Sequence, residues 1–495
     1  MTNKLSTPTR ALPFLAGALL AGCAPHVVTQ TDAAPNARIA RIERGLLPST
    51  QVKGRNYTPA TIEERLRAHK VPAVSIAVVN NGRIEWARAY GLADVESKRP
   101  ATTATLFQAA SISKPVSAVG ALRLVQDGRL SLDEDVNTKL ASWKVPPNEM
   151  TAQQPVTLRL LLTHASGLTV HGFPGYAPGA PVPTMPQLLS GEKPANTAAV
   201  RADIVPGSRW RYSGGGTTVM QLLMTDVTGE PFPQLMKRLV LDPIGMTSST
   251  YEQPLPVSRA QSAATGYRSN GTPIAGRFHT YPEMAAAGLW TTPSDLARYI
   301  ISVQQSLAGT SNKVLSKDMT SAMLTTGLGS QGLGPAVNGT GDSLRFSHGG
   351  SNEGFRANYY AFAKLGRGVV IMTNGDQGFA IIREIDDAIA REYGWRVLAP
   401  RVIVPVEMPA DVLRALPGRY VLTSAGAPPI QLVLAVENGI ITARQNDGAP
   451  FELIPTGKDE LTATVPAPPL RFVRDSAGVV TALLAGESRL ERQQP

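Results

Sequence analysis

The segment Leu106-Phe-Gln-Ala-Ala-Ser-Ile-Ser-Lys-Pro115 opens a strongly helical pattern. After Ser111, apolar residues recur at intervals of three and four, the spacing of one face of an α-helix: Ile112, Val116, Val119, Leu122 and Val125. Gly128 then supplies a stop signal. Because residues three apart share a helix face, the hydroxyl of Ser111 and the amine of Lys114 are predicted to meet at the start of this helix.

A serine at the start of a helix is well placed to act as a nucleophile. Free backbone N–H groups and the positive end of the helix dipole stabilise negative charge at a helix N-terminus. A lysine held away from water can remove the serine proton, so Ser111 and Lys114 form a candidate nucleophile and base. The alternative is that Ser111 is an ordinary N-cap. A second copy of the spacing, Ser190-Gly-Glu-Lys193, lies in a Gly/Pro-rich stretch with no helical pattern after it.

Two further motifs follow in order. Arg-Tyr212-Ser-Gly214 precedes a predicted helix at residues 217–228, and Phe-Ser-His348-Gly-Gly-Ser351 precedes a predicted strand at residues 359–363. A tyrosine near a lysine can accept a proton, and a Gly-Gly pair lets backbone approach a substrate closely. Taken singly, Tyr212 fits a packed aromatic residue and His348 a surface turn. Their order after Ser111 favours a common site.

Composition excludes several classes of protein. The chain has 495 residues, of which 43% are apolar and 17% charged, which excludes a disordered or coiled-coil chain and indicates more than one hydrophobic core. The net charge of +10 is scattered, without a basic run interleaved with aromatics, so we expect no nucleic-acid partner. One cysteine excludes an intramolecular disulfide framework, and the six histidines lack metal-ligand spacing, so no metal or cofactor is expected.

The order of elements predicts the fold class. Residues 74–79 and 83–88 read as a hairpin across Asn81-Gly82. Helices are predicted at residues 158–163, 217–228, 232–239 and 293–305, then strands at 359–363 and 368–372 and a helix at 379–393. Residues 169–210 are predicted to form a long surface loop. The pattern indicates an α/β (α+β) fold, with helices packed on a mainly antiparallel sheet, over residues 58–397.

The C-terminal region has a different character. Residues 398–409 are rich in Pro and Val and are predicted to be a linker. In residues 410–495, short alternating runs are separated by turn signals, which predicts a small all-β domain of barrel or sandwich type. The expected strands are 419–422, 430–436, 439–444, 451–454, 470–473 and 479–484.

The N-terminal region reads as a targeting segment. Lys4 and Arg10 precede a short apolar stretch, and Leu-Ala-Gly-Cys23 places the chain's single cysteine directly after small residues. Residues 1–22 resemble a bacterial lipoprotein signal, which implies lipidation at Cys23 and anchorage on the periplasmic face of a cell-envelope membrane; the alternative is an ordinary secretory signal. Residues 23–57 are predicted to be a tether.

The motifs together resemble the penicillin-recognising SxxK serine hydrolases, nearest to the class C β-lactamase-like branch of β-lactamases, D,D-carboxypeptidases, D-aminopeptidases and SxxK esterases. The resemblance covers about residues 58–395 and includes Leu-Leu-Thr-His164-Ala-Ser-Gly, Ala287-Gly-Leu-Trp-Thr-Thr-Pro-Ser-Asp295 and the motifs above. It implies an antiparallel sheet flanked by helices plus an all-helical subdomain. The C-terminal region resembles the lipocalin-like domain often appended to these enzymes.

The resemblance assigns roles to individual residues. It implies that Ser111 is the acylated nucleophile, that Lys114 and Tyr212 share the work of general base, and that His348 occupies the third motif. The backbone N–H groups of Ser111 and Ser351 would bind the oxyanion, beside Gly349 and Gly350. His164 is expected to cap and pack a helix.

One departure bears on the substrate. Gly214 stands where the family's second motif has asparagine, which favours an ester or small amide over a β-lactam or peptide. A β-lactamase or a D,D- or D-amino-acid peptidase is the alternative enzyme. A catalytically degenerate penicillin-binding sensor is the alternative outside enzymes.

Overall fold

The computed structural model describes residues 35–395, 400–423, 429–446, 448, 450–465 and 467–493. The predicted signal, Cys23 and the first part of the predicted tether lie outside these ranges. Within them, no helix combines the length and hydrophobicity that crossing a membrane requires.

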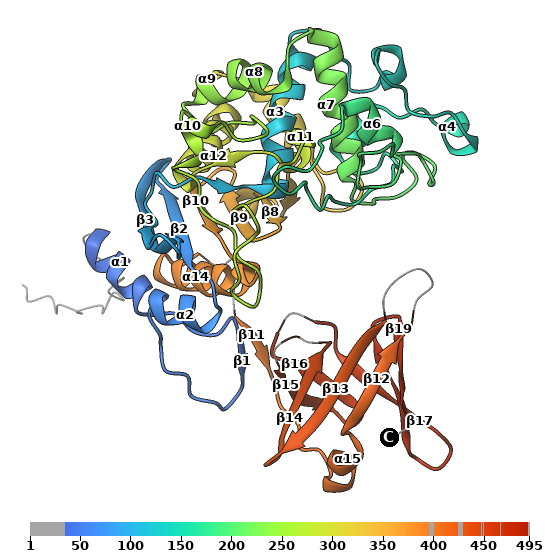
Figure 1. Ribbon diagram of the computed structural model, residues 1–495. Coiled ribbons are helices and arrows are strands. Elements are labelled where there is room, and N and C mark those ends of the chain that lie inside the picture. Colours follow the sequence, from blue (N-terminus) through green and yellow to red (C-terminus); the bar gives the residue numbers. More distant parts are fainter. Residues whose placement is uncertain are drawn as a thin grey trace, which may run out of the picture.

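A seven-stranded antiparallel sheet organises the larger domain (Figure 1). Its strands, in spatial order, are β4 (Arg99–Pro100), β3 (Arg83–Asp94), β2 (Ala73–Asn80), β10 (Arg367–Thr373), β9 (Phe355–Phe362), β8 (Arg345–Asn352) and β7 (Ala336–Asn338). The predicted β2–β3 hairpin is confirmed, with Asn81 and Gly82 at φ of 51° and 69° in its turn. The expected antiparallel sheet with flanking helices is therefore the observed fold.

Each face of the sheet has its own core. On one face, α14 (Gly378–Glu392) packs with α1 (Pro35–Glu43) and α2 (Ile62–Ala68) against residues such as Ile76 and Ile371. On the other face lie α3 (Ser113–Gln126) and α12 (Pro293–Ala308). The predicted helices at 293–305 and 379–393 are thus confirmed.

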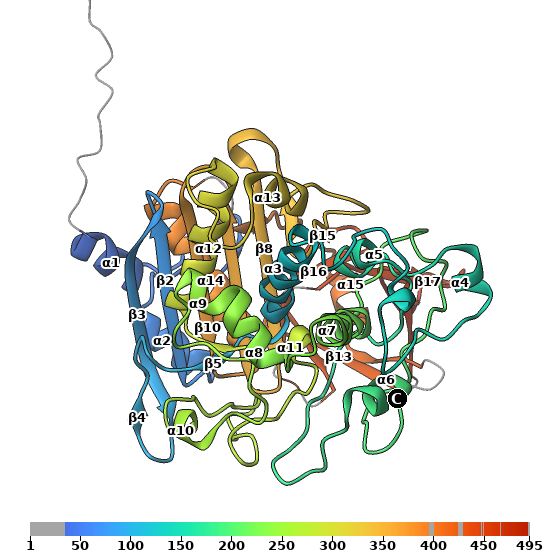
Figure 2. The ribbon, with the colours of Figure 1, turned by 90° about the horizontal axis from the view of Figure 1, so that it is seen from above.

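A helical block stands beside the β8 side of the sheet, with α3 between the sheet and helices α5 and α7 (Figure 2). Its elements are α4 (Glu149–Gln153), α5 (Leu158–Leu162), α6 (Met185–Ser190), α7 (Gly214–Thr228) and α11 (Met284–Ala287). The remaining helices of the domain lie on the α12 side: α8 (Phe232–Met236), α9 (Asp242–Ile244), α10 (Val257–Ala260) and α13 (Lys317–Met323). A two-stranded sheet of β5 (Phe107–Gln108) and β6 (Trp290–Thr291) leads into α3. The predicted loop 169–210 contains α6 and buries Leu188, Leu189 and Val200 in the core, so it is more than a surface loop.

The predicted tether and linker need correction. Ile39, Ile42 and Leu46 are buried against α14, so residues 35–46 belong to the folded domain. Strand β1 (Thr50–Val52), in the predicted tether, pairs in parallel with β11 (Arg401–Ile403), in the predicted linker. Short apolar segments of this kind lack a readable period, because their burial depends on partners 350 residues away in the chain.

The C-terminal region is a closed barrel, as expected from its alternating pattern. Its strands are β12 (Gly418–Leu422), β13 (Ile430–Glu437), β14 (Ile440–Gln445), β15 (Phe451–Gly457), β16 (Glu460–Ala463), β17 (Leu470–Arg474), β18 (Val480–Ala485) and β19 (Ser488–Arg492), preceded by α15 (Ala410–Ala415). Strands β16 and β19 were not predicted, because they are short and poor in β-branched residues. A small cluster of Val52, Ile403 and Ile454 joins the barrel to the β1–β11 pair.

Candidate active site

Ser111 lies in a tight turn that joins β5 to α3. The turn is a 3₁₀ segment, Ala110–Ile112, and Ala110 has a φ of 51°, a conformation that residues other than glycine rarely adopt. The hydroxyl of Ser113 donates to the carbonyl of Ala110 at 2.5 Å and accepts from the N–H of Leu289 at 3.0 Å. These contacts fix the turn, and Ser111 lies in it just before α3 begins at Ser113, close to the helix start that the sequence predicted for it.

Lys114 lies beside Ser111 in the first turn of α3. Its Nζ donates to the Ser111 hydroxyl at 3.2 Å and to the carbonyl of Ala286 at 2.8 Å. Only 4% of Lys114 is exposed, and within the described part of the chain it forms no ion pair. The amine is therefore held against the hydroxyl by a backbone carbonyl of α11 and not by a carboxylate.

Tyr212 reaches the same place from the segment that precedes α7. Lys114 Nζ lies 5.0 Å from the centre of the Tyr212 ring. The ring of His348 is 6.2 Å from the Tyr212 ring, centre to centre. The structure thus brings Ser111, Lys114, Tyr212 and His348 together from separate parts of the chain.

Two more histidines contact Tyr212, and sequence reasoning did not place them there. The ring centres of His164 and His171 lie 4.3 and 4.9 Å from that of Tyr212. His164 is 2% exposed, and its burial, followed by the charge of Lys114, holds its pKa well below the usual value. His164 is in a quoted family motif, but only the fold shows that this motif touches Tyr212.

His348, Gly349, Gly350 and Ser351 lie within β8, a strand that the sequence did not predict. The carbonyl of Gly349 lies 2.6 Å from His348 Nδ1, and because a carbonyl only accepts, Nδ1 must carry the proton. Burial and the charge of Lys114 lower the pKa of His348 to about 4. His348 is therefore a neutral imidazole near pH 7, with Nε2 as an acceptor.

Gly350 sets the distance between β8 and the turn that carries Ser111. A Cβ atom at Gly350 would lie 2.2 Å from the carbonyl oxygen of Ala109, so only glycine allows this approach. The adjoining Asn352 donates to Gln108 Oε1 at 2.8 Å and to the Ala287 carbonyl at 3.1 Å. Ser351 stands between Gly350 and Asn352 in the chain, so these contacts restrict its backbone position on both sides.

The loop after α5 occupies the space around Gly214. A Cβ atom there would lie 2.8 Å from Phe173 Cε2 and 2.9 Å from the carbonyl oxygen of His171. An asparagine side chain at Gly214 therefore does not fit unless this loop moves.

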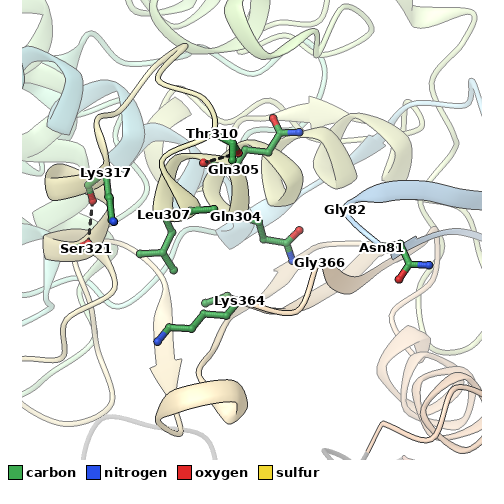
Figure 3. Close-up of a pocket in the computed structure, with 12 residues that line it drawn as sticks. Asn81, Gly82, Gln304, Gln305, Leu307, Thr310, Lys317, Ser321, Lys364 and Gly366 are labelled. Carbon is green, nitrogen blue, oxygen red and sulfur yellow. Dashed lines mark hydrogen bonds between the residues drawn. The ribbon is translucent and has the colours of Figure 1, made fainter. Parts of the chain in front are cut away.

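Cavities show where small molecules can enter. One of about 330 Å³ adjoins His171 and is lined mainly by apolar atoms of residues 169–172 and 197–199, with Arg201. A cavity of about 770 Å³ lies at the C-terminal end of α12, between that helix, α13 and the adjoining β2–β3 and β9–β10 turns (Figure 3). Its described lining residues include none of the predicted catalytic residues. Of these two cavities, the smaller one adjoins the site through His171, which contacts Tyr212.

The sequence of this chain is similar to those of known proteins. A family model described as Beta-lactamase matches residues 59–392. Esterase EstB of Burkholderia gladioli is 32% identical over 197 residues, 38% of this chain and 49% of that protein. Protein flp of Staphylococcus aureus (strain N315) is 27% identical over 239 residues, 47% of this chain and 44% of that protein. The matched segments span about half the length of these curated relatives.

Solved structures show the same fold. The octameric penicillin-binding protein homologue from Pyrococcus abyssi aligns with a TM-score of 0.56 and 21% identity, covering 87% of this chain and 98% of that one. The D-alanine carboxypeptidase AmpC from Burkholderia cenocepacia aligns with a TM-score of 0.53 and 20% identity, covering 67% of this chain and 96% of that one. With its family match extending over most of the larger domain, this chain belongs to the β-lactamase family of SxxK serine hydrolases.

Proposed function

We propose that this protein hydrolyses an ester or a small amide through a covalent acyl-enzyme on Ser111. The observation that carries the proposal is the 3.2 Å contact between Lys114 Nζ and the Ser111 hydroxyl, with Lys114 buried and without an ion pair in the described part of the chain. A positioned base at this distance is what a serine nucleophile needs. The esterase name of the Burkholderia gladioli relative supports the same class of substrate.

The proposed reaction has two halves. The Ser111 oxygen attacks the substrate carbonyl carbon, and its proton passes to Lys114, with Tyr212 sharing this work. The N–H groups of Ser111 and Ser351 donate to the oxyanion, and the alcohol or amine leaves with the proton that Lys114 and Tyr212 took from Ser111. Water then attacks the acyl-serine ester, releasing the acid and restoring the hydroxyl of Ser111.

Two features favour an ester or small amide over a β-lactam or a peptide acid. A β-lactam and a peptide acid each carry a carboxylate, and the neutral imidazole of His348 provides no positive charge to pair with it. The space beside Gly214 is filled by Phe173 and the His171 backbone, so no second-motif amide meets the substrate. The apolar cavity beside His171 is suited to a small acyl or alcohol group.

Intact-mass measurement tests the proposal. A fluorophosphonate should add to the wild-type protein and to the Ser190→Ala variant, which alters the other Ser-x-x-Lys copy, but not to Ser111→Ala. Rapid turnover of p-nitrophenyl esters with slow turnover of nitrocefin supports ester hydrolysis. A long-lived penicillin adduct or fast nitrocefin turnover would identify a penicillin-directed enzyme instead. No adduct in folded wild-type protein would identify a sensor.

We also propose that Cys23 is lipidated and holds the protein on the periplasmic face of a bacterial membrane. The support is the order of charged, apolar and small residues before the chain's single cysteine. Labelling of cells with an alkynyl fatty acid should mark the wild-type protein in the membrane fraction, and Cys23→Ser should remove the label. Equal labelling of the variant would contradict this, because the chain has no other cysteine.

A further inference from the structure

A cavity of about 540 Å³ lies on the face of the sheet opposite Ser111. Side chains alternate along a strand, so neighbours on β8 face opposite sides. Phe346 belongs to the core on the α3 side, and His348 shares its face. Ser347 lies opposite Tyr360 of β9, which belongs to the core under α14. Ser347 therefore borders this cavity, and His348 faces the catalytic side.

Three parts of the chain enclose the cavity. Strands β7 to β9 form its floor, α14 forms one wall through Asp386, and the β1–β11 pair closes it through Thr50 and Arg401. The segments that the sequence assigned to a tether and a linker are thus built into its wall. The cavity shares no lining residue with the site around Ser111 as described above.

Two deeply buried polar groups in its lining lack hydrogen-bond partners. Asp386 is 3% exposed and Tyr360 is 6% exposed, yet Asp386 Oδ1 and the Tyr360 hydroxyl have no partner among the described residues. The other Asp386 oxygen accepts from Asn358 Nδ2 at 3.2 Å. Buried polar groups are normally paired, and both atoms are closed off from solvent, so a ligand in the cavity bonds to them once the side chains around them shift.

The charge of the lining is positive. Arg345 and Arg401 are half-buried there, and the Arg345 side chain makes no hydrogen bond or ion pair within the described part of the chain. Among the described residues, the Arg401 side chain donates only to the backbone carbonyl of Ala463 in the barrel, at 3.4 Å. Burial raises the pKa of Asp386 to about 8, so near neutral pH its carboxyl is mainly protonated and does not neutralise the arginines.

We propose that this cavity binds a small hydroxylated anion, a carboxylate or phosphate on a polyhydroxy body. The acid group pairs with Arg345 and Arg401, and hydroxyl groups bond to Tyr360 and Asp386. Guanidinium groups match carboxylate and phosphate oxygens in geometry, and the two unpartnered atoms supply the complement for hydroxyls. This site is independent of the function proposed for Ser111.

Calorimetric titration of the full-length protein tests the site. The probes are D-gluconate and glucose 6-phosphate, with sorbitol as the uncharged counterpart. Wild-type protein and Ser111→Ala should both bind one or both anions saturably at millimolar concentration or below, and sorbitol more weakly. Loss of binding in Ser111→Ala would overturn the proposal, since it would place the anion in the catalytic site. Absence of binding of both anions by the wild type would also overturn it.

Matched variants locate the bound anion. Arg345→Gln should weaken binding by about tenfold or more, the cost of losing a charged hydrogen bond. The control is Arg367→Gln, because Arg345 and Arg367 both pair with Phe362 across the sheet, but Arg367 is not among the cavity's lining residues. Tyr360→Phe removes only the hydroxyl and should weaken binding severalfold. This variant tests the site independently if Arg345→Gln does not fold. Equal affinity in the cavity variants and the control would refute the site.

Discussion

His164 holds the backbone on both sides of Tyr212. Its carbonyl accepts the N–H of Arg211 at 2.8 Å, and its Nδ1 accepts the N–H of Ser213 at 3.3 Å. Its ring meanwhile packs against the Tyr212 ring, with centres 4.3 Å apart. Nδ1 accepts a hydrogen bond only when it is unprotonated, so this arrangement requires a neutral imidazole.

Protonation of His164 should therefore oppose folding. Its pKa is far below 6.5 in the folded protein and close to 6.5 in the unfolded chain, so between these values only the unfolded state binds the proton. Stability attributable to His164 is complete above pH 6.5 and is lost as the pH falls. From pH 7.5 to 5.5 this loss amounts to about 1.4 kcal/mol.

Urea unfolding at the two pH values measures this loss. His164→Asn keeps an acceptor for Ser213 but cannot titrate, so the variant should lose about 1.4 kcal/mol less than the wild type. The same loss in both proteins would show that His164 is not the titrating group.

Replacement of Lys114 by alanine should lower kcat/KM for p-nitrophenyl esters by about 10²–10⁴, the usual contribution of a positioned general base. The control is Lys193→Ala in the other Ser-x-x-Lys copy, where Gly191 ends α6 directly after Ser190. This control should keep wild-type kinetics. Activity retained in Lys114→Ala would show that Lys114 is not the base.

Two adjacent glycines in β8 should respond differently to alanine. A Cβ at Gly350 would meet the Ala109 carbonyl oxygen at 2.2 Å, whereas at Gly349 the nearest atom is 3.9 Å away. Gly350→Ala should therefore push β8 away from Ser111, lowering kcat/KM by at least tenfold and stability by about 1–3 kcal/mol. Gly349→Ala should be close to wild type. Ester kinetics and thermal melts measure both, and similar behaviour of the two variants would count against the packing described here.

His348→Lys should change substrate preference. A lysine would add a cation where the imidazole is neutral, so kcat/KM for nitrocefin, which carries a carboxylate, should rise relative to that for an uncharged p-nitrophenyl ester. His348→Gln, which stays neutral, should not shift this ratio. The ratio of kcat/KM values for the two substrates is the measurement, and an unchanged ratio in His348→Lys would remove this charge argument against β-lactams.

Local sequence patterns were sufficient to predict several features of the protein. The spacing of apolar residues after Ser111 predicted α3 and the approach of Lys114, because residues three apart on a helix are neighbours whatever surrounds them. Asn81-Gly82 likewise predicted its hairpin, since positive φ is a local property of these residues. The alternating C-terminal runs predicted a β domain, although not its full strand count.

Only the tertiary structure decided how distant segments meet. It placed His164 and His171 against Tyr212, made His348 part of a strand, and filled the space beside Gly214 with Phe173. It also turned the predicted tether and linker into paired strands that wall a cavity. Such contacts join residues far apart in the chain, so they depend on packing and hydrogen bonding that no local period records.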